Sequence, residues 1–232
     1  MLQKLKNDVY KANMALPDYD LVNFTWGNVS GISREKGLIV IKPSGVEYDA
    51  LSPESMVVVD MDGKVVEGNL APSVDTPTHL SLYKSFPNIC AVVHTHSTWA
   101  TVFAQCGKDI PAYGTTHADY FYGAIPCTRA LTDEEVNGKY EENTGLVIAE
   151  TFEKRSLDPV SMPAVIIKNH GPFAWGKNPL EAVKNAAILE LVAHMAVHTH
   201  LLGGAKTKPV SHNLLKRHYD RKHGKNSTYG QR

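Results

Sequence analysis

The segment Ala91–Ser97, with the sequence AVVHTHS, places the strongest constraint on how this chain can fold. Its leading residues are apolar and include two β-branched valines, which favours a buried strand. His94 and His96 follow with one residue between them. Because alternate side chains of an extended segment share a face, their Cα atoms would lie ~7 Å apart. Helix-compatible spacing continues over 99–105, so the segment predicts a strand that passes directly into a helix, with two imidazoles at the junction.

His94 and His96 have the spacing at which two imidazoles can share one divalent metal ion, although two polar residues at an exposed strand end are the alternative. A third ligand decides between these, and His170 qualifies because it too follows an apolar strand, predicted over 163–168. Three histidines leave an open coordination position, as in catalytic zinc sites, whereas structural zinc is usually closed by cysteines. The chain has three cysteines, none suitably spaced. We therefore predict a catalytic Zn²⁺ site.

The composition is that of an ordinary globular protein and bears on its partners. The 232 residues are 43% hydrophobic and 21% charged, which fits one domain over residues 1–232. Lys plus Arg equals Asp plus Glu at 24 each, so no global field favours nucleic acid or a membrane. No run of about 18 apolar residues is present, and residues 1–16 predict an amphipathic helix rather than a signal peptide. With an odd number of cysteines, these features predict a cytoplasmic protein with free thiols.

One loop carries groups that suit a phosphorylated ligand. Lys42-Pro43-Ser44-Gly45 follows a strand predicted over 38–41 and offers a cation, a hydroxyl and unhindered amides. The same residues also make a common turn. Glycines at positions 27 and 31 border a strand-like segment and let another group approach the backbone closely. The loop is thus either a phosphate cradle or a simple turn.

Asp75 stands just outside a predicted helix. Thr76 as N-cap and Pro77 at the first helical position indicate a helix that runs to about residue 85. A carboxylate in that place usually acts as a capping or dipole partner. The amides around Ser73 and Val74 can equally take an anion.

The other predicted elements form the scaffold. They are a hairpin at Asp62-Gly63, a capping-box helix from Thr132 with breaks at Gly138 and Thr144-Gly145, a loop over 114–123, and a long helix over 179–202 capped by Asn178. His194 and His198 on the long helix have the spacing of a metal pair. No glutamate separates them as in His-Glu-x-x-His, so we assign them, with His200, to the helix surface or to packing.

The C-terminal segment 208–232 is basic, with seven Lys or Arg against one Asp and a net charge of +6. It contains a helix predicted over 213–222. Such a tail fits either an arm for nucleic acid or a basic lid near an anionic substrate.

Six segments together are similar to the class II aldolase/epimerase family, in the same order and with similar spacing. They are 25–30 (TWGNVS), 41–45 (IKPSG), 75–79 (DTPTH), 94–97 (HTHS), 114–120 (GTTHADY) and 169–172 (NHGP). The resemblance implies an α/β protein with a three-layer α/β/α fold around a central, mainly antiparallel sheet. It covers the chain from the first residue to the tail.

The resemblance implies an activity as well. The nearest branch of the family consists of zinc-dependent 4-epimerases of pentose catabolism, which act in the breakdown of arabinose or of ascorbate. They interconvert L-ribulose 5-phosphate and D-xylulose 5-phosphate by retro-aldol cleavage and re-addition. A class II sugar-phosphate aldolase of the L-fuculose 1-phosphate type is the alternative, but such aldolases tend to have glutamate where this chain has Asp75. A non-catalytic module such as the adducin head is a second alternative, which the retained Asp119 and Tyr229 argue against.

Residue roles follow from the same resemblance. The zinc ligands would be His94, His96 and His170, with Asp75 beside or on the metal. The pocket for the substrate phosphate would comprise Gly27, Asn28, Lys42, Ser44, Gly45, Ser73 and Val74. Asp119 would be one acid/base and Tyr229 the other, with Tyr229 and His218 delivered by the tail of a neighbouring subunit in a C4 homotetramer. Val74 departs from the family pattern, where serine is frequent.

Overall fold

A computed structural model describes residues 2–224 and Ser227 and contains one seven-stranded sheet. The strand order is β4-β3-β2-β1-β5-β7-β6, and every neighbouring pair is antiparallel. The strands are β1 (Asn28–Ser33), β2 (Leu38–Ile41), β3 (Val57–Asp60), β4 (Val65–Glu67), β5 (Ala91–His94), β6 (Ala164–Ile166) and β7 (Pro172–Gly176). The antiparallel sheet expected from the family resemblance is confirmed, as is the β3–β4 hairpin.

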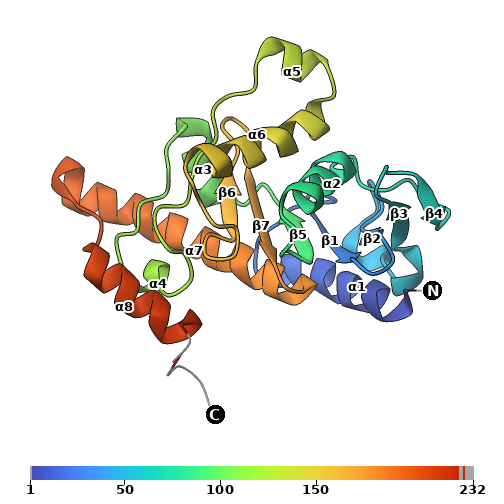
Figure 1. Cartoon of the computed structure of the whole chain (residues 1–232), viewed down its shortest axis with the longest axis horizontal. Coiled ribbons are helices and arrows are strands. Elements are labelled where there is room, and N and C mark those ends of the chain that lie inside the picture. The colour runs from blue at the N-terminus through green and yellow to red at the C-terminus, as the bar shows by residue number, and fades with distance from the viewer. Residues whose placement is uncertain (1, 225–226, 228–232) are drawn as a thin grey trace.

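Helices cover both faces of the sheet (Figure 1). They are α1 (Gln3–Asp18), α2 (Thr76–Ser85), α3 (Thr98–Cys106), α4 (Thr115–Ala118), α5 (Asp133–Asn137), α6 (Tyr140–Lys154), α7 (Pro179–Gly203) and α8 (His212–His223), with short 3₁₀ turns at Tyr48–Ala50, Pro53–Ser55 and Gly204–Lys206. On one face α1 and α7 approach β1 so closely that a Cβ on Gly31 would lie 2.9 Å from Leu5 and 3.3 Å from Pro179. On the other face Trp175 of β7 packs against Phe86 and Phe152, which belong to the α2 and α6 layer. The three-layer α/β/α fold is therefore confirmed.

Two predictions of local structure are wrong. The predicted break at Thr144-Gly145 is absent, because α6 runs unbroken from Tyr140 to Lys154. Gly145 instead allows α6 to contact α2, since a Cβ there would lie 2.5 Å from the Cβ of Ser81. The segment 114–123 is not all loop, because it contains the short helix α4.

The long helix α7 also corrects the expectation that no segment is apolar enough to span a bilayer. By length and composition alone α7 meets that criterion, with a mean hydropathy of 1.3 over its most apolar window. Its inner side packs on the sheet, because Ala182, Val183 and Leu189 are buried. The predicted N-cap is confirmed, since the Asn178 side chain accepts a hydrogen bond from the backbone amide of Glu181. The apolar composition of α7 thus partly reflects its place in the core.

Candidate metal centre

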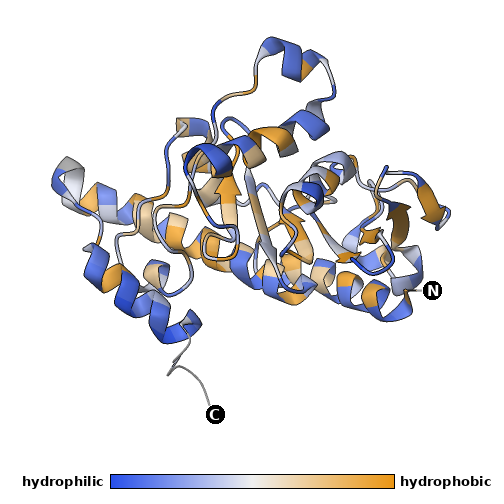
Figure 2. Cartoon of the chain, viewed as in Figure 1, coloured by the Kyte–Doolittle hydropathy of each residue, from blue (hydrophilic) through white to orange (hydrophobic). Residues whose placement is uncertain are grey.

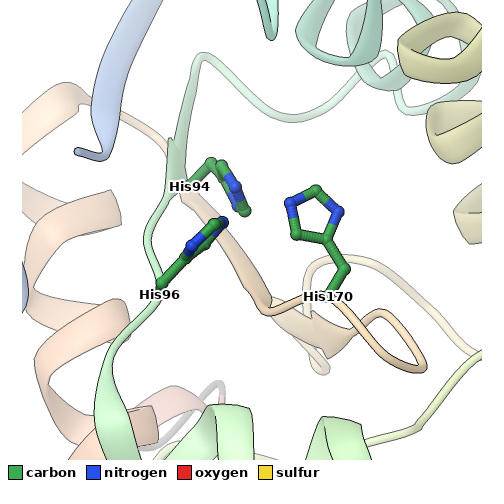
Figure 3. Close-up of side chains that lie close together, drawn as sticks. All are labelled: His94, His96 and His170. Atoms are coloured by element: carbon green, nitrogen blue, oxygen red, sulfur yellow. The ribbon is translucent and has the colours of Figure 1, made fainter.

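Three histidines from two distant parts of the sequence meet at one end of the central strands (Figure 3). His94 is the last residue of β5, His96 follows two residues later, and His170 lies in the turn between β6 and β7. Because β5 pairs with β7, that turn is carried to the end of β5. One nitrogen from each ring lies within 4.8 Å of the others, and the ring centroids are 4.8 to 5.0 Å apart. The structure thus brings the third predicted ligand to the first two.

Local contacts orient two of these rings. The Nδ1 atom of His94 lies 3.0 Å from the carbonyl oxygen of Pro172, to which it can donate, and Phe173 stacks on the same ring at 4.2 Å. A proton on Nδ1 leaves the Nε2 lone pair of His94 available to a metal. His170 Nδ1 lies 3.3 Å from the hydroxyl of Tyr140. No motif in the sequence marked Tyr140 as part of the site.

Burial favours the neutral form of all three imidazoles. It lowers the pKa of His94 and His96 below the ordinary value and lowers the pKa of His170 to about 3, where the charges of His94 and His96 act in the same direction. Neutral imidazole is the form that binds a divalent transition metal. Three such donors with an open side suit the Zn²⁺ predicted from the sequence.

Asp75, and not the predicted Thr76, is the N-cap of α2 by position, but its side chain makes no capping hydrogen bond. Its Oδ2 atom instead accepts a hydrogen bond of 2.7 Å from Asn28 Nδ2. Burial raises the pKa of Asp75, but the charges of His94 and His79 and the bond from Asn28 outweigh it, so that the pKa lies below its ordinary value. The capping interpretation of Asp75 is therefore wrong, because this carboxylate accepts a hydrogen bond from Asn28 and none from the backbone amides of α2.

The first residues of the predicted phosphate pocket adjoin the metal centre. Asn28 lies opposite His94 in the β1–β5 ladder, and its Nδ2 atom also donates to Ser73 Oγ at 3.0 Å. Gly27 has a φ of +76°, and a Cβ there would lie 3.1 Å from the carbonyl oxygen of His94. A side chain would thus be strained and crowded at position 27. The side of the metal centre next to Asp75 is therefore lined by Gly27, Asn28 and Ser73.

The loop that contains Lys42 is tied to the same region. Ser73 N donates to the carbonyl oxygen of Lys42 at 3.0 Å, and Ser44 N donates to that of Ala71 at 2.9 Å. Gly45 has a φ of +66°, with nothing within 4 Å of the position of a Cβ. Val74 lies beside them and is 65% exposed.

The Lys42 side chain is used inside this loop. Its ammonium lies 3.2 Å from the carbonyl oxygen of Thr25 and 3.1 Å from that of Val46, and 5.0 Å from the centre of the Tyr48 ring. Burial lowers the pKa of Lys42, while the charge of Glu47 opposes this. Lys42 thus braces the loops on either side of it, a role that the sequence did not reveal.

Asp119 and His218 form a second cluster, in which α4 and α8 lie side by side (Figure 1). The Oδ1 atom of Asp119 lies 3.0 Å from His218 Nδ1, and Arg221 contacts both carboxylate oxygens at 3.0 and 3.1 Å. Lys222 Nζ is 3.6 Å from the same carboxylate. Burial raises the pKa of Asp119, but the hydrogen bonds from His218 and Arg221 lower it below the ordinary value. Within one chain the Asp119 carboxylate is therefore held ionised and partnered by His218.

This cluster lies at the opposite end of the strands from the metal centre. Tyr120 and Lys222 line a cavity of about 300 Å³ together with Asn88, which precedes β5, and Gly176, which ends β7. Gly176 pairs with Ala91, the first residue of β5, whereas His94 is the last. Four extended residues span ~10 Å between their ends. Within one chain, Asp119 and His218 are therefore distant from the three histidines of the metal centre. Tyr229 lies outside the described residues.

A buried histidine, His117, supports the segment that contains Asp119. We expect it to make the stability of the fold depend on pH. His117 is 3% exposed, and its Nε2 atom lies 2.7 Å from the carbonyl oxygen of Gly123. Burial lowers the pKa of His117 to about 4. The unfolded chain therefore takes up the proton first as the pH falls below ~6.5, so the stability contributed by the neutral ring is complete above ~6.5 and lost toward pH ~4. Over this pH range the free energy of unfolding should fall by about 3 kcal/mol because of His117.

The expected result is that His117→Gln, which keeps a donor for Gly123, flattens the decline in unfolding free energy between pH 7 and pH 5. Urea denaturation at both pH values measures it. Other buried histidines act in the same direction, so some slope should remain. Identical slopes in the variant and the wild type would show that His117 is not the titrating group.

Comparison with known proteins adds independent findings. Residues 7–197 match the family described as Class II Aldolase and Adducin N-terminal domain. The chain is 57% identical over 231 residues to the L-ribulose-5-phosphate 4-epimerase UlaF of Salmonella paratyphi B, and 56% identical to that of Salmonella typhi, with 100% of both chains covered in each case. Among solved structures, an L-fuculose 1-phosphate aldolase has a TM-score of 0.78 at 26% identity and covers 94% of this chain and 95% of its own. The aldolase of that name from Thermus thermophilus has a TM-score of 0.69 at 25% identity, with 90% and 99% covered.

Proposed function

Because the chain belongs to the class II aldolase and adducin N-terminal domain family, we propose that it is an L-ribulose-5-phosphate 4-epimerase. The observation that carries this proposal is the set of three neutral histidines beside Asp75, in a chain that matches epimerase relatives over its whole length at 57% identity. The solved L-fuculose 1-phosphate aldolase shares the fold at only 26% identity. The epimerase is therefore the better supported of the two activities.

In this proposal His94, His96 and His170 hold one Zn²⁺ per chain, with Asp75 as a neighbour or fourth ligand. The bound ion supplies a Lewis acid for the carbonyl chemistry. The residues around it bind and orient the sugar phosphate. The amides and hydroxyls near Gly27, Ser44 and Ser73 receive the phosphate dianion, and Lys42 keeps their loops in place.

Inversion at C4 needs two proton-transfer groups on opposite faces of the substrate. A base removes the proton of the C4 hydroxyl, the C3–C4 bond breaks, the aldehyde fragment turns, and addition to its other face inverts the centre. We assign Asp119 as one acid/base, with His218 as its hydrogen-bonded partner, and Tyr229 as the other. An ionised carboxylate such as Asp119 is ready to accept a proton.

A neighbouring subunit is proposed to deliver Asp119 and His218, because one chain keeps them at the far end of the strands from its own histidines. The outer side of α7 supports self-association. Its exposed apolar side chains include Leu191, Met195, Leu201 and Leu202, the last of them 91% exposed. Figure 2 shows hydrophobic residues recurring along α7. We therefore propose a C4 homotetramer with shared active sites, acting in the cytoplasm, where free thiols such as Cys90 and Cys106 persist.

The activity is tested by incubating the purified, Zn²⁺-loaded protein with L-ribulose 5-phosphate. Carbon NMR of the products should show D-xylulose 5-phosphate and no accumulation of free aldehyde. L-Fuculose 1-phosphate, supplied in parallel, should be cleaved far more slowly. Release of glycolaldehyde phosphate without the epimer, or preference for L-fuculose 1-phosphate, would replace the proposal with an aldolase.

A further inference from the structure

A buried chain of hydrogen bonds lies behind the metal centre and includes no residue assigned above. Ser30 of β1 lies 2.7 Å from both the hydroxyl of Tyr83 and the Nδ1 atom of His79, which belong to α2. All three side chains are fully buried, with exposed fractions of 0%. Buried polar groups are normally hydrogen-bonded, so the direction of each bond in this chain can be worked out.

The phenol proton of Tyr83 determines which group donates in each of these hydrogen bonds. Ser30 Oγ is the acceptor that the described residues offer to the buried phenol proton of Tyr83, so Tyr83 donates to Ser30. Ser30 then donates its own proton to His79 Nδ1. A ring nitrogen that accepts a hydrogen bond carries no proton, so the ring proton of His79 sits on Nε2.

The Nε2 atom of His79 is buried, and within residues 2–224 it has no hydrogen-bond partner from the protein. His79 lies one helical turn after Asp75, and its backbone amide donates to the Asp75 carbonyl at 3.1 Å. The charges of Asp75 and His94 both act on the His79 ring. Phe173 contacts both imidazoles, with its centroid 6.0 Å from that of His79 and 4.2 Å from that of His94. A buried donor of fixed tautomer therefore stands beside the Asp75 edge of the site.

We propose that His79 is a positioning residue of the metal centre, which directs its Nε2 proton toward the Asp75 carboxylate and holds that group facing the three histidines. Asn28 donates to Oδ2 of the same carboxylate at 2.7 Å, so His79 would provide the second restraint. Ser30 and Tyr83 set the tautomer that makes this possible. The inference rests on the proposed metal site and deepens it.

Two substitutions separate this role from simple packing. His79→Gln places an amide nitrogen near the Nε2 position, whereas His79→Asn reaches only the Nδ1 position and retains the bond to Ser30. Zn²⁺ affinity is measured by competition with a chromophoric chelator. His79→Asn should bind Zn²⁺ about 10- to 100-fold more weakly, the usual cost of losing an outer hydrogen-bond partner, and His79→Gln should retain most of the affinity. Thr151→Val, which removes a buried hydroxyl of α6, should leave the affinity unchanged.

Nitrogen-15 NMR of histidine-labelled wild-type protein gives a second readout that needs no variant to fold. The His79 ring should show the Nε2–H tautomer, and Tyr83→Phe should reduce that preference. An Nδ1–H tautomer, or equal Zn²⁺ affinity in His79→Asn and wild type, would overturn the inference while leaving the metal site standing. A wild-type protein that binds no Zn²⁺ would overturn the metal site and this inference together.

Discussion

Epimerase turnover is expected to fall about 10³-fold or more when His94 is replaced by asparagine, because a metal Lewis acid supplies several kcal/mol of transition-state stabilisation and each 1.4 kcal/mol is about tenfold in rate. His94 is central to the site, since its ring contacts His96, His170 and Phe173. The measurement is the initial rate of D-xylulose 5-phosphate formation, together with metal content by elemental analysis. The variant should contain little Zn²⁺.

The matched control is His194→Asn on α7. His194 stacks on Trp99 at 4.3 Å and has His198 one helical turn away, the spacing of a rival metal pair. The control should keep one Zn²⁺ per chain. Chelation of the wild-type protein should abolish activity, and added Zn²⁺ should restore it. If His194→Asn lost its metal and His94→Asn retained it, the metal would lie on α7 and the site proposed here would be wrong.

The second large effect is expected from Asp119→Asn, which should slow turnover by about 10²- to 10⁴-fold, the range typical of a lost general acid or base. Zn²⁺ content should stay normal, because Asp119 lies at the far end of the strands from the histidines of its own chain. The asparagine keeps hydrogen-bonding capacity toward His218 and Arg221, so the fold of the α4–α8 contact should persist.

Mixing the two inactive variants tests whether active sites are shared. In heteromers of His94→Asn and Asp119→Asn chains, some sites combine the intact histidines of one chain with the intact Asp119 of its neighbour. Random assembly of equal amounts should restore activity to about a quarter of the wild-type sites in a cyclic assembly. No recovery, with mixed oligomers verified by mass spectrometry, would place Asp119 at the metal of its own chain or outside the reaction.

Much of the local structure could be predicted because its signals are local. The apolar run before His94 is strand β5, Asp62-Gly63 makes the β3–β4 hairpin, and Asn178 begins α7. The Thr132 capping box is also present, with Glu135 bonded in both directions. In each case the turn chemistry and side-chain periodicity of a few neighbouring residues determine the conformation.

Distant contacts were less accessible from the sequence. His170 was expected as the third ligand from its position after an apolar strand, but only the β5–β7 pairing brings it to His94. The role of Asp75 changed because Asn28, which is distant in the sequence and lies on β1, donates to its carboxylate. The residues next to Lys42 in the sequence do not indicate that its side chain is buried among backbone carbonyl groups.

Strands β2 and β5, the β3–β4 hairpin, helix α7 and the three candidate metal-binding histidines could be predicted from the amino-acid sequence alone, because residue type and spacing encode them directly. The folded chain was needed to show that Asp119 pairs with His218 at the far end of the strands, and that Ser30 joins the buried side chains of Tyr83 and His79. These arrangements depend on which strands are neighbours and how α2, α4 and α8 pack, and no short stretch of sequence contains that information.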